Sequence, residues 1–219
     1  MIADDLIEKA YEALRDAEIP PCVKGADCDE VRPNRSSPIP AYHFHPDNDY
    51  DRHCHTVDLH KKSAIFLRLP DPQLEPPAPD DPNYMLVTDT RLPKWRLGTG
   101  AGRYRPGAHP IKIPTPARYA EEMFYLVCRD MKGLGHRGYW EVQLTYMVSL
   151  LEDPKSDVFR ISDVAQPARG YLELYISETA SFKDMRRYAK RVRAKLIERN
   201  ELPPPPRCGE SEQESWDEE

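Results

Sequence analysis

"TPARYAEEMFYLVCRDMKG", residues 115–133, is the stretch that decides the fold. Its apolar side chains recur at the three- and four-residue spacing of one helical face, namely Ala120, Met123, Phe124, Val127, Cys128 and Met131. Thr115 suits an N-cap, Pro116 suits the first helical turn, and Gly133 suits a C-terminal stop. The stretch therefore predicts a helix from Pro116 to about Met131, with one face in the main core.

Helical patterns also occur on both sides of this stretch. Residues 4–17 carry apolar side chains at helical spacing, with acids at the start. Residues 139–151 are apolar almost all round, which is typical of a helix central to a core. Residues 181–200 open with Ser181 and Asp184, a pair that resembles a capping box. The short segment 171–176 is rich in β-formers and predicts a strand.

Residues 19–116 have a different composition. The chain holds 23 prolines, where average usage of about 5% would give about 11. Two short apolar stretches in this half, residues 63–69 and 84–88, predict strands, and six prolines in residues 70–82 predict an extended loop between them. We expect an α+β fold: a small mixed sheet packed by C-terminal helices, with a proline-rich irregular N-terminal half.

The charge is unevenly distributed along the chain. Residues 201–219 hold seven of the 37 acids and one of the 31 bases, which leaves 30 of each in residues 1–200. We expect residues 1–200 to form a single α+β domain, divided into an N-terminal helix (1–18), proline-rich loops with short strands (19–116) and a helical core with one strand (117–200). The acidic segment 201–219 is poor in apolar residues, and we expect it to be a disordered tail.

Cysteine usage and hydropathy bear on location. The five cysteines are few and odd in number, which favours reduced thiols over a disulfide framework. Cys128 lies on an apolar helical face, so a buried inert thiol is expected. No apolar run is long enough to span a bilayer, and the acidic start does not resemble a signal peptide. We expect an intracellular protein, cytoplasmic or nuclear.

Five of the seven histidines lie in "HFHPDNDYDRHCHTVDLH", residues 43–60. Imidazole is a preferred zinc ligand, and alternate residues of a strand share a face. We expect a zinc site formed by His43, His45, His53, His55 and Asp58. A polar loop without metal is the alternative, because the segment offers one cluster and no Cys-x-x-Cys pair. The aspartates lack the glycine and distal glutamate of an EF-hand, which argues against calcium.

The pattern "HFHP…HTVD" resembles part of the His-x-His-Pro…Ser-x-x-Asp signature of JAMM-type zinc isopeptidases. The resemblance implies that His43, His45 and Asp58 bind zinc and that an upstream glutamate activates water. His55 stands where that family has serine, and the spacing is longer. The segment also resembles the His-hydrophobic-His motif of replication endonucleases, with Tyr188 as the helix-borne tyrosine, although Pro46 would interrupt the strand.

Two basic regions predict binding to anions. In the last predicted helix, Lys183, Arg187, Lys190 and Arg191 fall opposite the apolar stripe and could contact phosphates. The second region combines basic side chains with an aromatic one, a pattern that suits binding of single-stranded nucleic acid. Its residues are Lys94, Trp95, Arg96, Arg103 and Arg105. A solvated helical face balanced by the acidic tail, and a flexible basic loop, are the alternatives. "GTGAGRYR" lacks the Gly-Lys-Ser/Thr ending of a phosphate-binding loop.

These patterns favour a non-catalytic interaction protein, of a viral or regulatory kind, that docks protein partners and binds nucleic acid through its basic regions. The sequence has no Gly-x-Ser-x-Gly nucleophile motif, and we assign no catalytic residue. The alternative is a zinc-dependent hydrolase built on residues 43–60.

Overall fold

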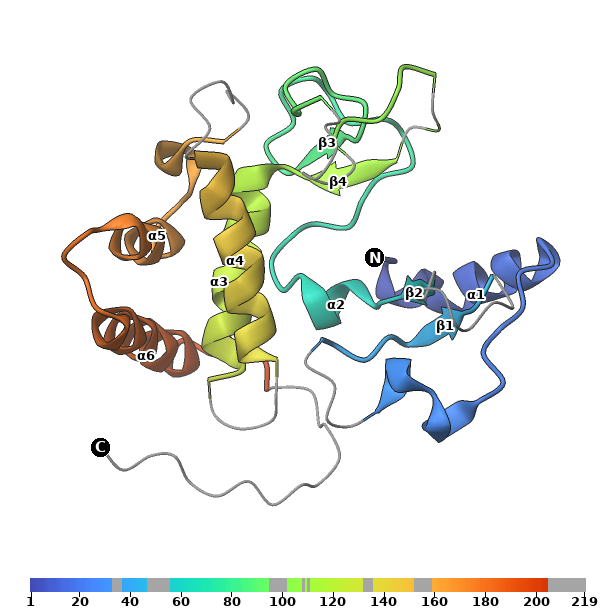
Figure 1. Cartoon of the computed structure of the whole chain (residues 1–219), viewed down its shortest axis with the longest axis horizontal. Helices are drawn as coiled ribbons and strands as arrows, with labels where there is room; N and C mark the ends of the chain where they lie inside the picture. The colour runs from blue at the N-terminus through green and yellow to red at the C-terminus, as the bar shows by residue number, and fades with distance from the viewer. Residues whose placement is uncertain are drawn as a thin grey trace.

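The computed structural model describes residues 1–32, 37–46, 56–94, 102–107, 109, 111–131, 136–151 and 159–204. The predicted α+β class is confirmed (Figure 1). Among these described residues, the strands form two separate antiparallel pairs, β1–β2 and β3–β4, and not one small mixed sheet. The helices are α1 (Ile7–Asp16), α2 (Lys62–Ile65), α3 (Pro116–Arg129), α4 (Arg137–Leu151), α5 (Ala168–Ile176) and α6 (Phe182–Glu198), and the strands are β1 (Tyr42–Phe44), β2 (Val57–Leu59), β3 (Tyr84–Leu86) and β4 (Lys112–Pro114).

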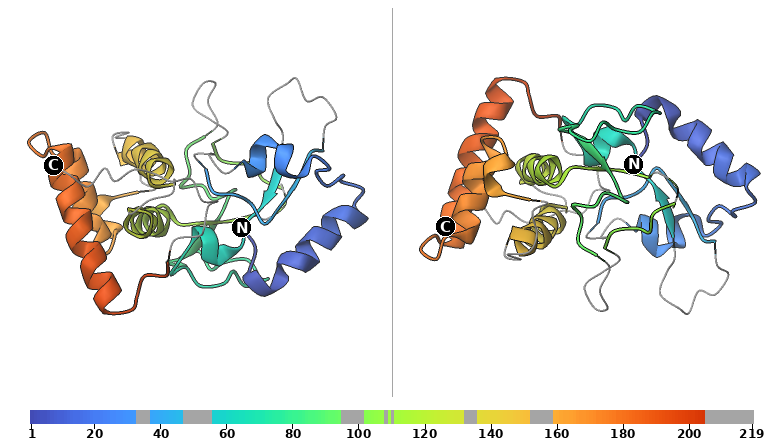
Figure 2. Two further views of the ribbon diagram at one scale, coloured as in Figure 1. Left: turned by 90° about the horizontal axis from the view of Figure 1, so that it is seen from below. Right: turned by 90° about the horizontal axis from the view of Figure 1, so that it is seen from above.

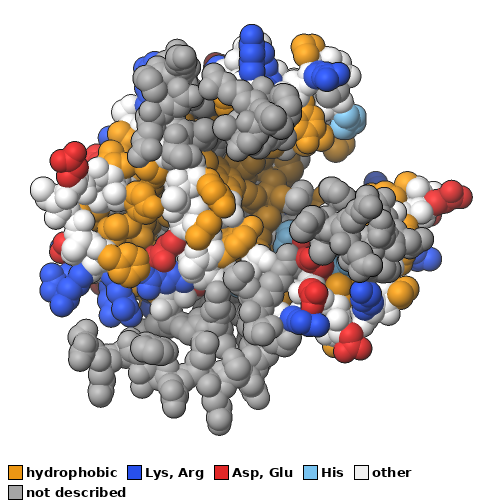
Figure 3. Space-filling view, in the orientation of Figure 1, with side chains coloured by type: hydrophobic (Ala, Val, Ile, Leu, Met, Phe, Trp, Pro, Cys, Tyr) orange, Lys and Arg blue, Asp and Glu red, His pale blue; other side chains and the backbone are white. Residues whose placement is uncertain are grey.

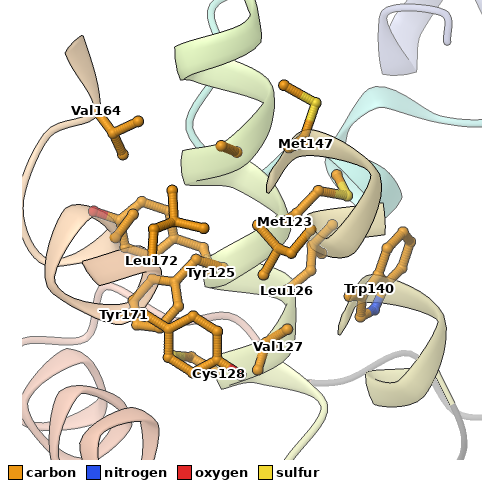
Figure 4. Close-up of a cluster of buried hydrophobic side chains, with 14 of the residues drawn as sticks. Met123, Tyr125, Leu126, Val127, Cys128, Trp140, Met147, Val164, Tyr171 and Leu172 are labelled. Atoms are coloured by element: carbon orange, nitrogen blue, oxygen red, sulfur yellow. The ribbon is translucent and has the colours of Figure 1, made fainter. Parts of the chain in front are cut away.

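Helix α3 is the centre of the main hydrophobic core. Every residue from Ala120 to Arg129 is buried, because α4, α5 and α6 all pack against this helix (Figures 1 and 4). Helix α4 buries Trp140 and Leu144 on the side facing α3. It is less enclosed than its sequence predicts, since the side chains of Val142 and Tyr146 are exposed.

The β3–β4 pair leads directly into α3. Tyr84 pairs with Pro114 at the end of β4, which confirms a strand in the predicted segment 84–88. Pro116 occupies the first turn of α3 as expected. Thr115 stands at the N-cap, but its hydroxyl donates to the carbonyl of Pro82 at 2.8 Å instead of capping a helix amide. Thr115 thus fixes the β3 loop to the start of α3.

The N-terminal elements enclose a second, smaller hydrophobic cluster. Ile7 of α1, Phe44 of β1 and Leu59 of β2 are its buried members. The β1–β2 pair and α6 lie on opposite sides of the α3–α4 pair (Figures 1 and 2). The 3-10 turns η1 (Asp4–Leu6), η2 (Gly25–Asp27) and η3 (Asp29–Val31) belong to this N-terminal part, and η4 (Ile161–Asp163) precedes α5.

Two predicted strands are wrong. Residues 171–176 belong to helix α5, in which Ala168, Tyr171 and Leu172 are buried at the i, i+3, i+4 spacing of a helix. Residues 63–69 form the end of the short helix α2 and a following loop, whose Phe66 and Leu69 are buried in the main core. Both segments are short and apolar, and the apolar residues of such segments fit the spacing of a helix as well as that of a strand.

Helix α6 begins as the sequence predicts, whereas the first residues after it depart from the predicted tail. Ser181 and Asp184 form the predicted capping box. Residues 201–204, the first part of the predicted tail, are described, and Leu202 packs against the main core. The remainder of the predicted tail, residues 205–219, lies outside the described residues, as does Gly133. A single domain over residues 1–200 stays a prediction. In the described part of the chain, no helix has the length and apolar character needed to cross a membrane.

Candidate metal centre and basic surface

Four side chains with metal-binding atoms converge in the N-terminal part: Cys22, Cys28, His43 and His45. Their ligand atoms all lie within 4.8 Å of one another, and this group could hold a metal ion. The Cys28 Sγ atom is 3.3 Å from Nε2 of His43 and 3.4 Å from Nε2 of His45. The two imidazole rings are almost perpendicular, with centroids 5.3 Å apart. Both rings therefore point the same type of nitrogen at one sulfur.

The histidines are placed by the alternation of strand β1. Phe44 lies between them and is fully buried in the N-terminal cluster beside Leu59. Since successive residues of a strand point to opposite faces, burial of Phe44 directs His43 and His45 together to the other face. Antiparallel pairing of β1 with β2 fixes this orientation, with His43 opposite Asp58.

The cysteines are placed by a loop that returns to β1. Pro21 forms a bridge with Phe44, and the Cys22 amide donates to the His43 carbonyl at 3.1 Å. Gly25 then adopts a φ of +53°, a conformation that side chains disfavour, and lets the chain reverse. The Cys28 amide donates to the Gly25 carbonyl at 3.1 Å, which closes the turn, and the Cys28 side chain is buried.

The Cys28 thiol is in a protected environment. Burial raises its pKa, while a hydrogen bond from the backbone of Glu30 acts in the opposite direction and the neighbouring Cys22 adds to the rise. A bound divalent cation would favour the thiolate, because its positive charge stabilises a negative sulfur that burial removes from water. Among the described residues, Cys22, Cys28 and Cys128 are free cysteines.

The structure treats the five predicted metal ligands differently. It brings His43 and His45 together. Asp58 is not in the group; its Oδ2 atom lies 4.0 Å from Nε2 of His60. His53 and His55 lie outside the described residues. Cys22 and Cys28 were not predicted as ligands. The sequence pattern that could have indicated them is the pair Cys-x₅-Cys, which a proline-rich stretch separates from the histidines.

The predicted basic face of α6 lies at the surface. Lys183, Arg187, Lys190 and Arg191 are all exposed, and Figure 3 shows Lys and Arg side chains gathered over this helix at the lower left. Arg187 forms an ion pair with Asp184, one turn before it, at 3.6 Å. Arg191 lies 5.9 Å from the ring centroid of Tyr188. The cations of this face thus stand at the surface of a helix whose other side packs on the core.

Part of the second basic region is also visible. Lys94 forms a bridge with Arg103, and the Arg103 guanidinium donates to the Thr90 carbonyl at 3.0 Å. Lys94 and Arg105 are exposed, whereas Arg103 is half-buried. Trp95 and Arg96 lie outside the described residues. The structure thus joins Lys94 to Arg103 but leaves the aromatic part of this prediction untested.

A groove of about 540 Å³ runs along α6 and continues the basic surface. Its cations are Arg191 and Lys195 of α6, the C-cap residue Arg199, and Arg68. The aromatic residues Tyr125 and Tyr188 also line it. Arg68 was not predicted as part of this surface, because it belongs to the loop after α2, more than a hundred residues before α6.

Comparisons with family models, with curated proteins and with solved structures find no match to this chain. The resemblance to JAMM-type isopeptidases thus gains no support. In the structure, the groups that join His43 and His45 are two cysteines and not Asp58. The endonuclease resemblance also lacks support, because the Tyr188 hydroxyl donates to the Pro167 carbonyl at 2.8 Å and α6 lies across the α3–α4 pair from β1 (Figure 2).

Proposed function

We propose that this chain is a zinc-stabilised, non-catalytic binding protein whose basic α6 face binds nucleic acid. The observation that carries the zinc part is the convergence of Cys22, Cys28, His43 and His45. Tetrahedral zinc with Zn–S near 2.3 Å and Zn–N near 2.0–2.1 Å places sulfur and nitrogen about 3.6 Å apart. The two S···N distances of 3.3 and 3.4 Å are close to that value.

The ligand set supports zinc and a structural role. Thiolate and imidazole in a mixed tetrahedral set suit zinc, whereas magnesium and calcium prefer oxygen ligands. Four protein ligands fill a tetrahedral shell, while hydrolytic zinc sites keep one position for water. A Cys₂His₂ set therefore supports a structural ion over the hydrolase alternative.

The charge of α6 supports the nucleic-acid part. Exposed Lys and Arg side chains can replace the counterions of a phosphate backbone, and such binding weakens steeply with salt. Lys190 and Arg191 lie in the middle of the exposed face. Tyr188, at the edge of the adjoining groove, adds an aromatic side chain of the kind that bases contact in single strands. We therefore expect single-stranded nucleic acid to be the preferred ligand.

Metal analysis of the purified full chain tests the zinc site. We expect one equivalent of zinc in the wild type and loss of most of it in Cys28→Ser and in His43→Ala. Cys208→Ser and His109→Ala are matched controls outside the group and should retain the metal. Absence of bound zinc from wild-type protein prepared with zinc present, or full retention by both site variants, would contradict the proposal.

Oligonucleotide binding tests the basic face. Fluorescence anisotropy with a single-stranded oligonucleotide should show affinity that falls with salt, and Lys190→Glu with Arg191→Glu should weaken it by more than about tenfold at low salt. The double variant should also reduce the slope of log K against log salt by about 0.7 for each phosphate that it no longer neutralises. Lys9→Glu, on the exposed side of α1, is the control. An equal decrease of affinity in the control, or no binding by the wild type, would exclude α6 as the interface.

A further inference from the structure

The groove along α6 already holds one carboxylate, and that carboxylate begins the acidic segment. Glu201 accepts a hydrogen bond from Nη2 of Arg68 at 2.6 Å. The Arg68 guanidinium in turn lies 4.0 Å from the ring centroid of Tyr125 and donates to its hydroxyl. Stacking on the ring and the bond to Glu201 hold Arg68 facing into the groove.

The chain after Glu201 stays close to the core. Leu202, the next residue, packs against the main hydrophobic cluster. The α6 helix thus ends with its following segment bound at two successive residues, one by charge and one by apolar contact. Residues 207–219 then carry six acids and one base.

We propose that the acidic segment of residues 207–219 docks on the cationic face of α6, extending the contact that Glu201 makes with Arg68. The occupant of this face in the free protein is therefore the chain's own acidic segment. Its consequence, competition with nucleic acid for the same cations, rests on the function proposed above.

Charge and reach both fit this occupant. Six cations of α6 and its C-cap are exposed, namely Lys183, Arg187, Lys190, Arg191, Lys195 and the C-cap residue Arg199, and six acids lie in residues 210–219. Helix α6 has 17 residues and is about 26 Å long at 1.5 Å per residue. Residues 203–210 begin with four prolines, and eight residues in a polyproline conformation would span about 25 Å at about 3.1 Å per residue. Acids from Glu210 onward can therefore reach every turn of α6.

Cross-linking of the full-length protein tests the docking directly. A carbodiimide joins a carboxylate to a lysine amine only where the two are in contact, and mixed isotope-labelled protein identifies links within one chain. We expect links from residues 210–219 to Lys183, Lys190 and Lys195, and their disappearance at about 0.5 M salt, where the screening length falls to a few ångströms. Lys9 on α1 is the matched exposed control. Links that reach Lys9 as often as Lys190 would overturn the inference.

A full-length variant with the six acids of residues 210–219 changed to Gln or Asn tests the competition. A tethered competitor acts at an effective concentration of about 1 mM, so a segment with a Kd near 0.1 mM would weaken ligand binding about tenfold. We expect the variant to bind the oligonucleotide about tenfold more tightly at low salt. Links to α6 without any oligonucleotide binding would support docking and overturn the nucleic-acid function. Oligonucleotide binding with unchanged affinity in the variant would overturn competition.

Discussion

Three acidic side chains of the α3 segment are buried, and each binds another segment of the chain. Glu121 accepts the Ala165 amide at 2.7 Å, and Asp130 accepts the Trp140 indole N–H at 2.6 Å. Glu122, which has no exposed surface, accepts the backbone amides of Leu67 and Arg68. A buried carboxylate is stable only when such donors surround it. These acids therefore fix three surrounding segments to the central helix.

The substitution Glu122→Gln tests this role. The Oε2 atom of Glu122 accepts from both backbone amides, and Oε1 also accepts from Arg68. Gln replaces one of these oxygens with an NH₂ donor and makes the other a neutral acceptor, so the contacts to the two amides weaken, and we expect a decrease of about 1–3 kcal/mol in the free energy of unfolding. Gln is the closest available isostere, which separates charge and hydrogen bonding from packing. Urea denaturation of both proteins at a fixed pH measures the difference.

The pH dependence of that difference has a defined sign. Burial raises the pKa of Glu122, against the lowering effect of the Arg68 and Leu67 amides. The folded protein then holds the Glu122 proton more tightly than the unfolded chain. Stability linked to this group is present at low pH and is lost as pH rises from the ordinary glutamate value through the raised one. We expect the difference in the free energy of unfolding between the wild type and Glu122→Gln to decrease as pH rises across this window. A difference that increases with pH would contradict a raised pKa of Glu122.

The metal-binding residues show which part of a site a sequence can indicate. His43 and His45 were predictable as a pair because they alternate within and just after a short strand. Their partners were not, since Cys22 and Cys28 reach them through a left-handed Gly25 and two 3-10 turns that have no periodic signal. Ligand pairs that are separated by a proline-rich stretch become neighbours only through the fold.

At the scale of elements, α5 and α6 are in close contact at Gly170. A Cβ atom on Gly170 would lie 2.3 Å from the Tyr188 hydroxyl oxygen and 2.9 Å from the ring carbon that carries it. Tyr188 cannot easily move, because its hydroxyl donates to the Pro167 carbonyl and its ring lies beside Phe124. Gly170 therefore sets the separation of the two helices.

Gly170→Ala should destabilise the protein by about 1–3 kcal/mol through overpacking. This effect would appear although alanine favours a helix over glycine by about 1 kcal/mol. Gly138→Ala in α4 is the matched control, because a Cβ there meets nothing within 4 Å. It should leave the protein unchanged or more stable. Urea denaturation of the two variants measures the contrast, and equal effects would show that Gly170 has no packing role.

Helices α1, α3 and α6 were predictable because each has a regular apolar face and a recognisable start, and α4 was predictable because it is apolar on most sides. Helix α5 was not predictable, because the apolar residues of "YLELYI" fit both a helix and a strand. Its packing against α3 and α6 selects the helix. The same limit applies to residues 63–69, where burial of Phe66 and Leu69 in the main core determines the path of the chain. The local sequence pattern determines the type of the long elements, whereas tertiary packing determines whether a short segment is a helix, a strand or a loop.

At the scale of the whole molecule, the two hydrophobic clusters differ greatly in size. The cluster around α3 includes residues from α3 to α6, whereas the described part of the N-terminal cluster has three buried members, Ile7, Phe44 and Leu59. So small a core supplies little stability by itself, and small folded units commonly depend on a metal or a disulfide. The candidate metal group lies on the opposite face of β1 from Phe44. A bound ion would thus join the Cys22–Cys28 loop to the strand that organises this cluster.

Removal of metal should therefore loosen one end of the molecule and not the other. We expect a chelator, added to the full-length protein at neutral pH, to accelerate amide hydrogen exchange in β1, β2 and the Cys22–Cys28 loop by at least about tenfold, because metal binding is coupled to folding of its ligand loop. Amides of α3 and α6 should keep their protection. Cys28→Ser should reproduce the pattern without a chelator, and Cys208→Ser should not. Exchange that rises equally in α3 would mean that the two clusters unfold as one unit, and the N-terminal part would then owe its stability to the main core.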